Sequence, residues 1–456
     1  MKSAVLRRLI QAPFRKFRTV ATPYAEVVEA LDATLARTQG YARNAIVMVA
    51  QVDDLDHLYR QYTGVDVDGI LRKLSDRMKG GILRRDMVRR LDGGQFAIVL
   101  SPLYGRSTDD VLLLAGQVQA LLAAPLRISD TDIHVSVSIG CALARSENLE
   151  TGADMLEAAR IALVEARAQG PAGLRFYVAA MGEQVRERRA LGKSIHAAMQ
   201  SGDILAYFQP QIALDSRKVS GVEVLARWKH REKGLISPGV FLPILAEVGL
   251  MRSLGRLMLR DALRALAEWQ ASGLVVPTIS INMCADELRD VGIVQDITKQ
   301  LRTYNIAPER LVIEVLETVY AGDQSDPIIR NLALLAKLGC KIDLDDFGTG
   351  HASIKSVRNF SVARIKIDRS FITDVDHDPD QQQVVKTILS VAQNLSVATL
   401  AEGVETEAEI RHLAASGCGH AQGFAIAHPL PATEAFAWMM AHRAPEASAQ
   451  MARQLH

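Results

Sequence analysis

The chain lacks several features that would assign its class at once. Its four cysteines include no CxxC pair, which argues against a disulfide framework or a cysteine zinc site and is typical of a reducing cytosol. No apolar run approaches the roughly 20 residues that a membrane-spanning helix needs. The net charge is only +1, so no overall charge draws the chain to nucleic acid or to an anionic membrane. We therefore expect a cytoplasmic protein that does not bind nucleic acid.

The N-terminus is the one strongly biased segment. The first 20 residues carry six basic residues, and no acidic residue precedes Glu26. They contain no long apolar core, so a secretory signal is not indicated. Two interpretations stay open: a basic tail, which we favour, or an amphipathic anchor that makes weak contact with a membrane surface.

The 456 residues exceed one ordinary core, so two or three domains are expected. Residues 1–39 form the basic tail and a helix over 23–39. Residues 40–178 alternate strands and helices, with a hairpin at 87–100 that turns at Asp92-Gly93-Gly94. Residues 179–201 are charged and helix-prone, which predicts a helical connector. We expect residues 441–456 to be a C-terminal tail.

Residues 202–440 have a different pattern. Eight short strand-like runs alternate with helical stretches such as 253–271 and 326–338. This alternation predicts an α/β fold of the TIM-like (β/α)8 barrel type, with a doubly wound open sheet as the alternative.

Polar residues gather at the ends of these predicted strands, and carboxylates dominate them. Such ends converge at one face of a barrel, where clustered carboxylates repel one another unless cations bind. Oxygen ligands without His or Cys favour Mg²⁺ or Mn²⁺. The adjacent Asp345 and Asp346 could serve two ions, as in two-metal phosphoesterases. Any one of these residues alone is better explained as a helix cap or a solvated loop charge. The set comprises Glu223, Asn282, Glu314, Glu317, Asp345, Asp346, Lys366, Glu402 and Gln422.

The motifs that hold these residues follow one another in a recognisable order. They are FQP (208–210), EVLARW (223–228), SPGVFLPILAE (237–247), INMCADEL (281–288), EVLE (314–317), DDFGTG (345–350), KIDRSF (366–371), EGVET (402–406) and QGF (422–424). Together they resemble the EAL family of cyclic di-GMP phosphodiesterases over residues 195–440. The resemblance implies hydrolysis of one phosphodiester of cyclic di-GMP to give linear pGpG, two Mg²⁺ or Mn²⁺ ions, and a homodimer.

The resemblance also implies roles for single residues. Glu223, Asn282, Glu314 and Asp345 would hold one metal, and Asp345, Asp346 and Glu402 the second. Lys366 would orient or activate the attacking water, and Gln422 would complete the site. Gln209 and Arg227 would contact the substrate, where a guanidinium suits a phosphate. Glu317 would anchor the loop after Asp346, and Glu405 would support the metal ligands without binding a metal itself.

Three departures from the family pattern stand out. Val224 replaces the alanine of the signature, which changes packing and no ligand. Cys284 stands where a serine is common. His351 and Ala352 stand where the family has an aromatic residue and a serine, in a loop that couples dimerisation to metal binding. His351 as a metal ligand is the less favoured interpretation.

Residues 40–178 resemble the GGDEF family of cyclases, which make cyclic di-GMP from GTP. The signature here reads Asp92-Gly93-Gly94-Gln95-Phe96, and Gln51 falls where a metal-binding aspartate is expected. Phosphoryl transfer needs metal-bound charge neutralisation, which neutral amides serve poorly. Tyr59 and Leu83 likewise replace a guanine contact and the first residue of an inhibitory site. We expect no cyclase activity: either a scaffold that aids dimerisation, which we favour, or a weak GTP-binding regulator.

Three functions are compatible with these observations. The favoured function is a metal-dependent phosphodiesterase with an inactive GGDEF-like domain. A receptor that binds cyclic di-GMP without cutting it is the alternative, although such receptors usually lack several metal ligands. A pure interaction module is the third, and the intact ligand set argues against it.

Overall fold

The structure, a computed structural model, describes residues 22–38, 45–55, 58, 67–80, 86–100, 108–128, 131–144, 147, 149–316, 326–348 and 362–443. The chain divides into two compact units, Met1–Glu187 and Arg188–His456. The domain limits expected from the sequence stay predictions. None of the helices in the described ranges is both long enough and apolar enough to cross a membrane.

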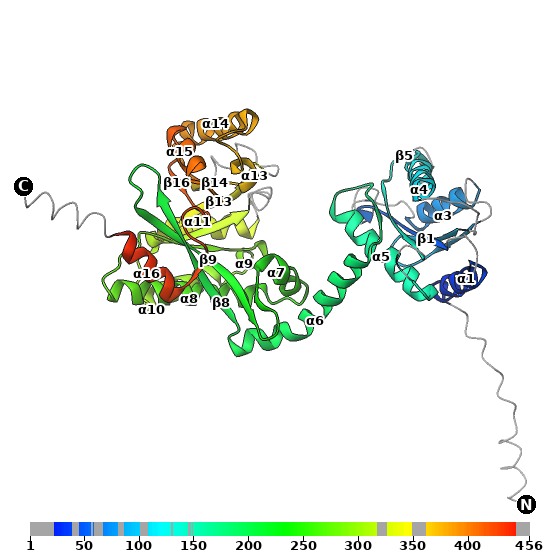
Figure 1. Cartoon of the computed structure of the whole chain (residues 1–456), viewed down its shortest axis with the longest axis horizontal. Coiled ribbons are helices and arrows are strands. Elements are labelled where there is room, and N and C mark those ends of the chain that lie inside the picture. The colour runs from blue at the N-terminus through cyan, green and yellow to red at the C-terminus, as the bar shows by residue number, and fades with distance from the viewer. Residues whose placement is uncertain are drawn as a thin grey trace, which may run out of the picture. The chain divides into compact units, whose positions relative to one another are not determined.

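The first unit is a five-stranded sheet with helices on both faces. The strand order is β2-β3-β1-β6-β7, with β1 antiparallel to β3 and β6. Figure 1 shows α3 and α4 on one face and α1 and α5 on the other, and each face has its own core. The elements are α1 (Pro23–Thr38), β1 (Ile46–Val52), α3 (Val67–Gly80), β2 (Met87–Arg90), β3 (Gln95–Leu100), α4 (Thr108–Ala123), β4 (Leu126–Ile128), β5 (Thr131–Ile133), β6 (Val137–Leu143), α5 (Gly152–Ala168) and β7 (Leu174–Phe176).

The second unit is a closed eight-stranded barrel, which confirms the predicted barrel and excludes the open sheet. The order β8-β9-β11-β12-β13-β14-β15-β16 closes because β16 pairs with β8. The barrel is not wholly parallel, since β8 runs antiparallel to both neighbours. After α6 (Ala179–Ser201), the barrel strands are β8 (Ile204–Ala213), β9 (Val219–His230), β11 (Ile279–Asn282), β12 (Leu311–Leu316), β13 (Lys341–Phe347), β14 (Val362–Ile367), β15 (Ala398–Ala401) and β16 (His420–Ala421).

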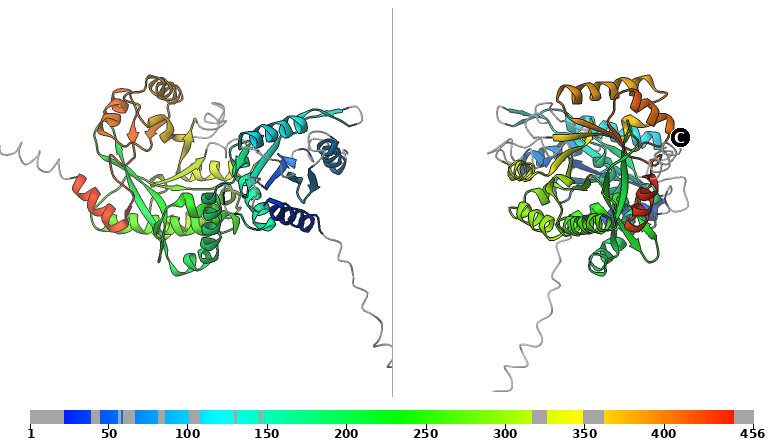
Figure 2. Two further views of the ribbon diagram at one scale, coloured as in Figure 1. Left: turned by 45° about the vertical axis from the view of Figure 1, so that its right-hand side comes forward. Right: turned by 90° about the vertical axis from the view of Figure 1, so that its left-hand side faces the viewer.

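Helices cover the outside of this barrel. α14 and α15 lie on one side of it and α8 and α10 on the opposite side, an arrangement visible in Figure 1 and again in Figure 2. The outer elements are β10 (Gly234–Ile236), α7 (Pro238–Glu247), α8 (Met251–Ala271), α9 (Ala285–Leu288), α10 (Ile293–Thr303), η1 (Pro308–Arg310), α11 (Pro327–Leu338), α13 (Arg369–Ile372), α14 (Pro379–Asn394), α15 (Glu407–Ala415), β17 (Leu430–Pro431) and α16 (Ala432–His442).

Local sequence signals explain where these helices begin and end. α11 starts at Asp326, whose carboxylate accepts the Ile328 N–H at 3.0 Å, and it ends at Gly339 with φ 112°. α15 starts with a capping box in which Thr406 and Glu409 satisfy each other's backbone N–H groups. Such caps satisfy the unpaired groups of a helix terminus. They fix the positions at which the chain returns to the barrel strands.

Alternation along the strands separates the barrel interior from the outer core. On β13, Ile342 and Leu344 belong to the apolar core beneath the helices, while Asp343 and Asp345 are buried on the other face. On β14, Ile365 and Ile367 pack outward, and Arg364 and Lys366 alternate with them. Since successive side chains point to opposite faces, the polar residues line the barrel interior.

Candidate functional site

One pocket of the second unit collects the predicted site residues. It lies at the carboxyl ends of the barrel strands, where the active sites of such barrels are found. Its apolar wall includes Leu242, Met251, Leu254, Leu316 and Phe424. Its polar lining contains Gln209, Glu223, Asn282, Glu314, Asp345, Asp346, Lys366, Glu402, Glu405 and Gln422.

Lys366 is the centre of the polar cluster. Its side chain is 1% exposed, and its Nζ lies 2.8 Å from Glu314 Oε2, 2.8 Å from Asp345 Oδ1, 2.7 Å from Glu402 Oε1 and 3.7 Å from Glu223 Oε2. Four carboxylates from four strands or strand ends therefore share one ammonium group. The cluster keeps an excess of negative charge, which a cation can balance.

Amide side chains hold Glu223 in place. Asn282 Nδ2 donates to Glu223 Oε1 at 2.8 Å, and Gln422 Nε2 donates to Glu223 Oε2 at 2.6 Å and to Gln209 Oε1 at 3.0 Å. Gln211 Nε2 donates to Gln422 Oε1 at 2.8 Å. This chain of donors fixes Glu223 as an acceptor and links β8, β9, β11 and the end of β16.

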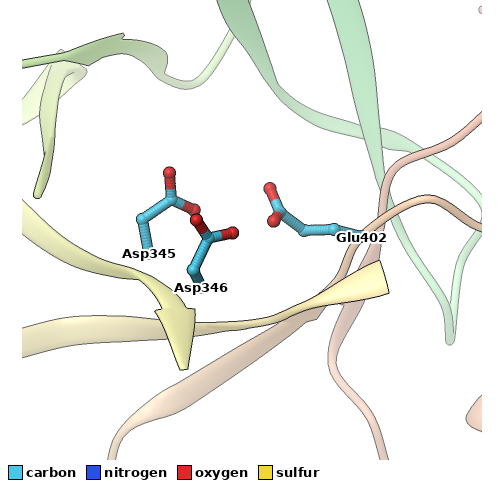
Figure 3. A group of neighbouring side chains, drawn as sticks. All are labelled: Asp345, Asp346 and Glu402. Carbon is cyan, nitrogen blue, oxygen red and sulfur yellow. The ribbon is translucent and has the colours of Figure 1, made fainter. Parts of the chain in front are cut away.

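A β-bulge brings two consecutive aspartates to the same site. Residues that follow one another on a strand normally face opposite sides. The β13–β14 register is interrupted between Leu344 and Phe347, and Asp346 has φ 52°. Figure 3 shows the carboxylates of Asp345 and Asp346 side by side, with Glu402 facing them. One oxygen from each of the three lies within 4.8 Å of the others.

The crowding of carboxylates shifts their protonation. Burial would lower the pKa of Lys366, but its carboxylate neighbours raise that pKa well above the ordinary value. Burial, together with the charges of neighbouring carboxylates, raises the pKa of Glu402 to about 8 and that of Asp346 to about 6. Burial and then Glu223 raise the pKa of Glu314 well above its usual range. Without a cation, the cluster therefore holds protons near neutral pH.

The donor set fits hard divalent cations. Glu314 is fully buried, and its Oε1 has no hydrogen-bond donor among the residues that the structure describes. A buried carboxylate oxygen of this kind is expected to have a partner. The oxygens that line the pocket come from carboxylates and amide side chains, which are ligands that Mg²⁺ and Mn²⁺ prefer.

Two predicted residues that the structure describes fall outside the central cluster. Arg227 stacks over Tyr207, with its Cζ 5.9 Å from the ring centroid, and does not line the pocket. Glu405 lines the rim and accepts from Arg369 Nη2 at 2.6 Å. Glu317 lies outside the described residues, as do His351 and Ala352.

The sequence did not single out several polar residues near this cluster, among them three on the barrel strands. Gln211 belongs to the amide chain, and Asp343 and Arg364 form a buried ion pair with 2.6 Å between Arg364 Nη2 and Asp343 Oδ2. Burial raises the pKa of Asp343, against the opposing effect of Arg364. Each lies two residues from a predicted site residue on the same strand. Alternation could therefore have placed them inside the barrel.

In the first unit, two amides occupy the positions at which the sequence predicted lost metal ligands. Gln95 Nε2 donates to Gln51 Oε1 at 3.1 Å across the paired strands β3 and β1. Asp53 accepts from Ser138 Oγ at 2.7 Å and from the Ala172 N–H at 2.9 Å. Tyr59 and Leu83 lie outside the described residues.

Both parts of the chain match known protein families. Residues 193–429 match the EAL domain family, and residues 26–172 match the diguanylate cyclase, GGDEF domain family. The chain is 30% identical to the bifunctional diguanylate cyclase/cyclic di-GMP phosphodiesterase MucR of Pseudomonas aeruginosa, over 81% of this chain and 53% of that protein. It is 27% identical to the cyclic di-GMP phosphodiesterase PdeR of Escherichia coli, over 86% and 58% respectively. The chain thus spans about half the length of the curated relatives it matches.

Two solved structures of EAL proteins resemble this chain. The PaMucR phosphodiesterase in complex with c-di-GMP is 33% identical, with a TM-score of 0.51, and covers 53% of this chain and 98% of its own. The EAL enzyme Bd1971 has a TM-score of 0.53 and covers 87% of this chain and 95% of its own. Its sequence identity is 18%, so this likeness supports the fold and nothing further. The matches to the two family models agree with the closed barrel and with the order of its motifs. This chain therefore belongs to the EAL family, and a domain of the GGDEF family precedes its EAL domain.

Proposed function

We propose that this chain hydrolyses cyclic di-GMP to linear pGpG with the help of two divalent cations, Mg²⁺ or Mn²⁺. The observation that carries the proposal is the convergence of Glu223, Glu314, Asp345 and Glu402 on Lys366 inside one pocket. The relatives named as cyclic di-GMP phosphodiesterases, and the PaMucR complex with c-di-GMP, support this choice of substrate.

The proposed roles follow the contacts. Glu223, Asn282, Glu314 and Asp345 would hold one cation, and Asp345, Asp346 and Glu402 the other. When bound, such ions polarise a phosphoryl oxygen and lower the pKa of a coordinated water. Gln422, held by Gln211, keeps Glu223 in its acceptor role.

Substrate binding would use the remaining features of the pocket. Lys366, fixed among its carboxylates, would orient the attacking water beside the phosphodiester. Gln209 lines the polar floor and Phe424 the apolar wall, and an aromatic wall suits a purine base through stacking. Arg227 would meet a phosphate only after its side chain leaves the ring of Tyr207.

The GGDEF-like unit is proposed to be catalytically inactive. The hydrogen-bonded pair Gln51–Gln95 offers no negative charge to a metal at these two positions. We expect this unit to act as a scaffold or regulator, and the whole chain to form a homodimer. Incubation with GTP and Mg²⁺ should therefore yield no cyclic di-GMP, and formation of that product would contradict this part of the proposal.

The test of the main proposal is product analysis. Purified protein is incubated with cyclic di-GMP and Mg²⁺ or Mn²⁺ and separated by chromatography, beside Glu223→Ala and the control Glu232→Ala. Glu232 is exposed, in the turn between β9 and β10. We expect pGpG from the wild type and the control and none from Glu223→Ala. Intact substrate with measurable binding would instead identify a receptor that does not cut its ligand.

A further inference from the structure

Two inward-facing cations and two inward-facing carboxylates form a matched ladder on neighbouring strands. Asp343 and Asp345 lie two residues apart on β13, and Arg364 and Lys366 lie two residues apart on β14. Arg364 stands directly opposite Asp343 in the strand register. The upper pair joins Lys366 Nζ to Asp345 Oδ1 at 2.8 Å. The lower pair joins Arg364 Nε and Nη2 to Asp343 Oδ2 at 2.7 and 2.6 Å.

The lower pair is deeply buried and lies next to the acidic cluster. The side chains of Arg364 and Asp343 are 9% and 2% exposed. Asp343 also stands directly opposite Glu314 in the β12–β13 register. A buried ion pair is a weak source of stability, because desolvation offsets most of the attraction. Apolar side chains could fill this layer of the barrel, so the pair calls for another explanation.

The balance of charge inside the barrel gives a reason for the pair of Arg364 and Asp343. Without the guanidinium of Arg364, Asp343 would be a buried carboxylate without a cation of its own, opposite Glu314 in the strand register. The next inward-facing cation on β14 is Lys366, which already serves four carboxylates. An unpaired Asp343 would compete for Lys366 and draw its ammonium away from the layer that faces the pocket.

We propose that Arg364, paired with Asp343, is a positioning residue that keeps Lys366 and Glu314 in the geometry required for cation binding. The inference rests on the proposed function and extends it to a layer of the barrel below the metal ligands. Arg364 is not among the residues that line the pocket. It acts by neutralising Asp343, so that Lys366 serves the upper layer alone.

The experiment measures Mn²⁺ affinity of the full chain by titration calorimetry after removal of metals with EDTA. Arg364→Gln keeps a hydrogen-bond donor for Asp343 but removes the charge. Asp343→Asn/Arg364→Gln removes both charges, leaving an amide pair like Gln51–Gln95 in the first unit. Arg310→Leu is the matched control, since Arg310 is half-buried on η1 and donates to Val276 O at 2.8 Å outside the barrel interior.

We expect Arg364→Gln to bind Mn²⁺ roughly 10–100-fold more weakly than the wild type, the usual effect of removing a group that supports metal ligands. The double variant should recover most of the lost affinity, because no unpaired Asp343 remains. Arg310→Leu should lower the unfolding temperature and leave Mn²⁺ affinity unchanged. A merely structural role for Arg364 would instead move the unfolding temperature without moving the affinity.

Two results would overturn the inference while leaving the proposed function intact. One is wild-type Mn²⁺ affinity in Arg364→Gln. The other is a double variant that binds as weakly as Arg364→Gln, which would show that Asp343 does not compete for Lys366. A wild-type chain that binds no Mn²⁺ and releases no pGpG would overturn the inference and the proposed function together.

Discussion

At the scale of single residues, Lys366 is the cation at the centre of the buried carboxylates in the barrel. It is the shared ion-pair partner of Glu223, Glu314, Asp345 and Glu402, and its side chain is almost fully enclosed. Removing one partner of a buried charge network leaves the other charges uncompensated. Lys366 is thus expected to matter for stability as well as for catalysis.

Lys366→Met should destabilise the metal-free protein and abolish hydrolysis. We expect the free energy of unfolding in EDTA to fall by about 3–5 kcal/mol, the usual cost of breaking a buried ion pair. Added Mn²⁺ should stabilise this variant more than the wild type, because a cation replaces the lost charge. Denaturant unfolding with and without Mn²⁺ measures both effects.

Lys341→Met is the control for this variant, since Lys341 lies exposed at the start of β13. It should leave stability and hydrolysis close to those of the wild type. If Lys366→Met unfolded in EDTA at the wild-type denaturant concentration, the described charge network would not contribute to stability.

His420 gives the barrel a dependence on pH. Burial, assisted by the charge of Arg364, lowers the pKa of His420 to about 4, against about 6.5 in an unfolded chain. The unfolded state therefore binds more protons between these two values. Stability contributed by neutral His420 is present above pH 6.5 and is lost as the pH falls toward 4.

His420→Gln should remove part of this acid sensitivity. On moving from pH 7.5 to pH 5, the wild type should lose about 1 kcal/mol more unfolding free energy than the variant, after allowance for the partial exposure of His420. Denaturant unfolding of both proteins at the two pH values measures the difference. Equal losses in the two proteins would mean that His420 does not titrate abnormally.

At the scale of elements, the closing strand β16 depends on a glycine. A Cβ on Gly423 would lie 2.1 Å from Val404 O and 2.2 Å from Val404 N, which are backbone atoms that cannot turn away. The segment after β16 therefore approaches the segment after β15 too closely for any side chain. This approach places Gln422 within reach of Glu223 and Gln209.

Gly423→Ala should separate these two segments and move Gln422 away from Glu223. We expect a loss of about 1–3 kcal/mol in unfolding free energy, as for other overpacked sites, with a fall in hydrolysis. Gly419→Ala, just before β16, is the milder comparison, because its Cβ would lie 3.3 Å from Thr399 O and needs a shift of only a few tenths of an ångström. It should therefore cost less stability and less hydrolysis than Gly423→Ala. Normal activity in Gly423→Ala would show that the position of Gln422 tolerates such a shift.

At the scale of the whole molecule, the proposed site belongs to one unit. The polar residues that line the pocket fall between Gln209 and Gln422, inside the unit Arg188–His456 and inside the match to the EAL family. No pocket residue of this set comes from the first unit. The geometry of the pocket is therefore expected to survive separation of the units.

A fragment of residues 179–456, which keeps helix α6 whole, should fold and release pGpG from cyclic di-GMP. Its rate should follow that of the full chain unless the first unit regulates it, in which case the rate changes and the product does not. Circular dichroism and chromatography test folding and activity. A folded fragment without activity would show that the first unit completes the site.

Local patterns in the sequence predicted the barrel and most of the polar residues that line the pocket. Strand-like runs between helices, with polar residues where the runs end, depend on local patterns that the chain displays directly. Residues 253–271 and 326–338 were expected to be helical, and the structure has α8 at Met251–Ala271 and α11 at Pro327–Leu338. The roles assigned to the site residues stay predictions.

The way in which these residues meet depends on strand pairing across the whole barrel. The bulge at Asp345 and Asp346, the antiparallel placement of β8 and the ladder of Asp343 with Arg364 follow from the pairing of strands that lie far apart in the sequence. The position of Arg227 over the Tyr207 ring is likewise a tertiary feature, and its contact with the substrate stays a prediction. Register and side-chain direction depend on closure of the whole barrel, which no local pattern contains.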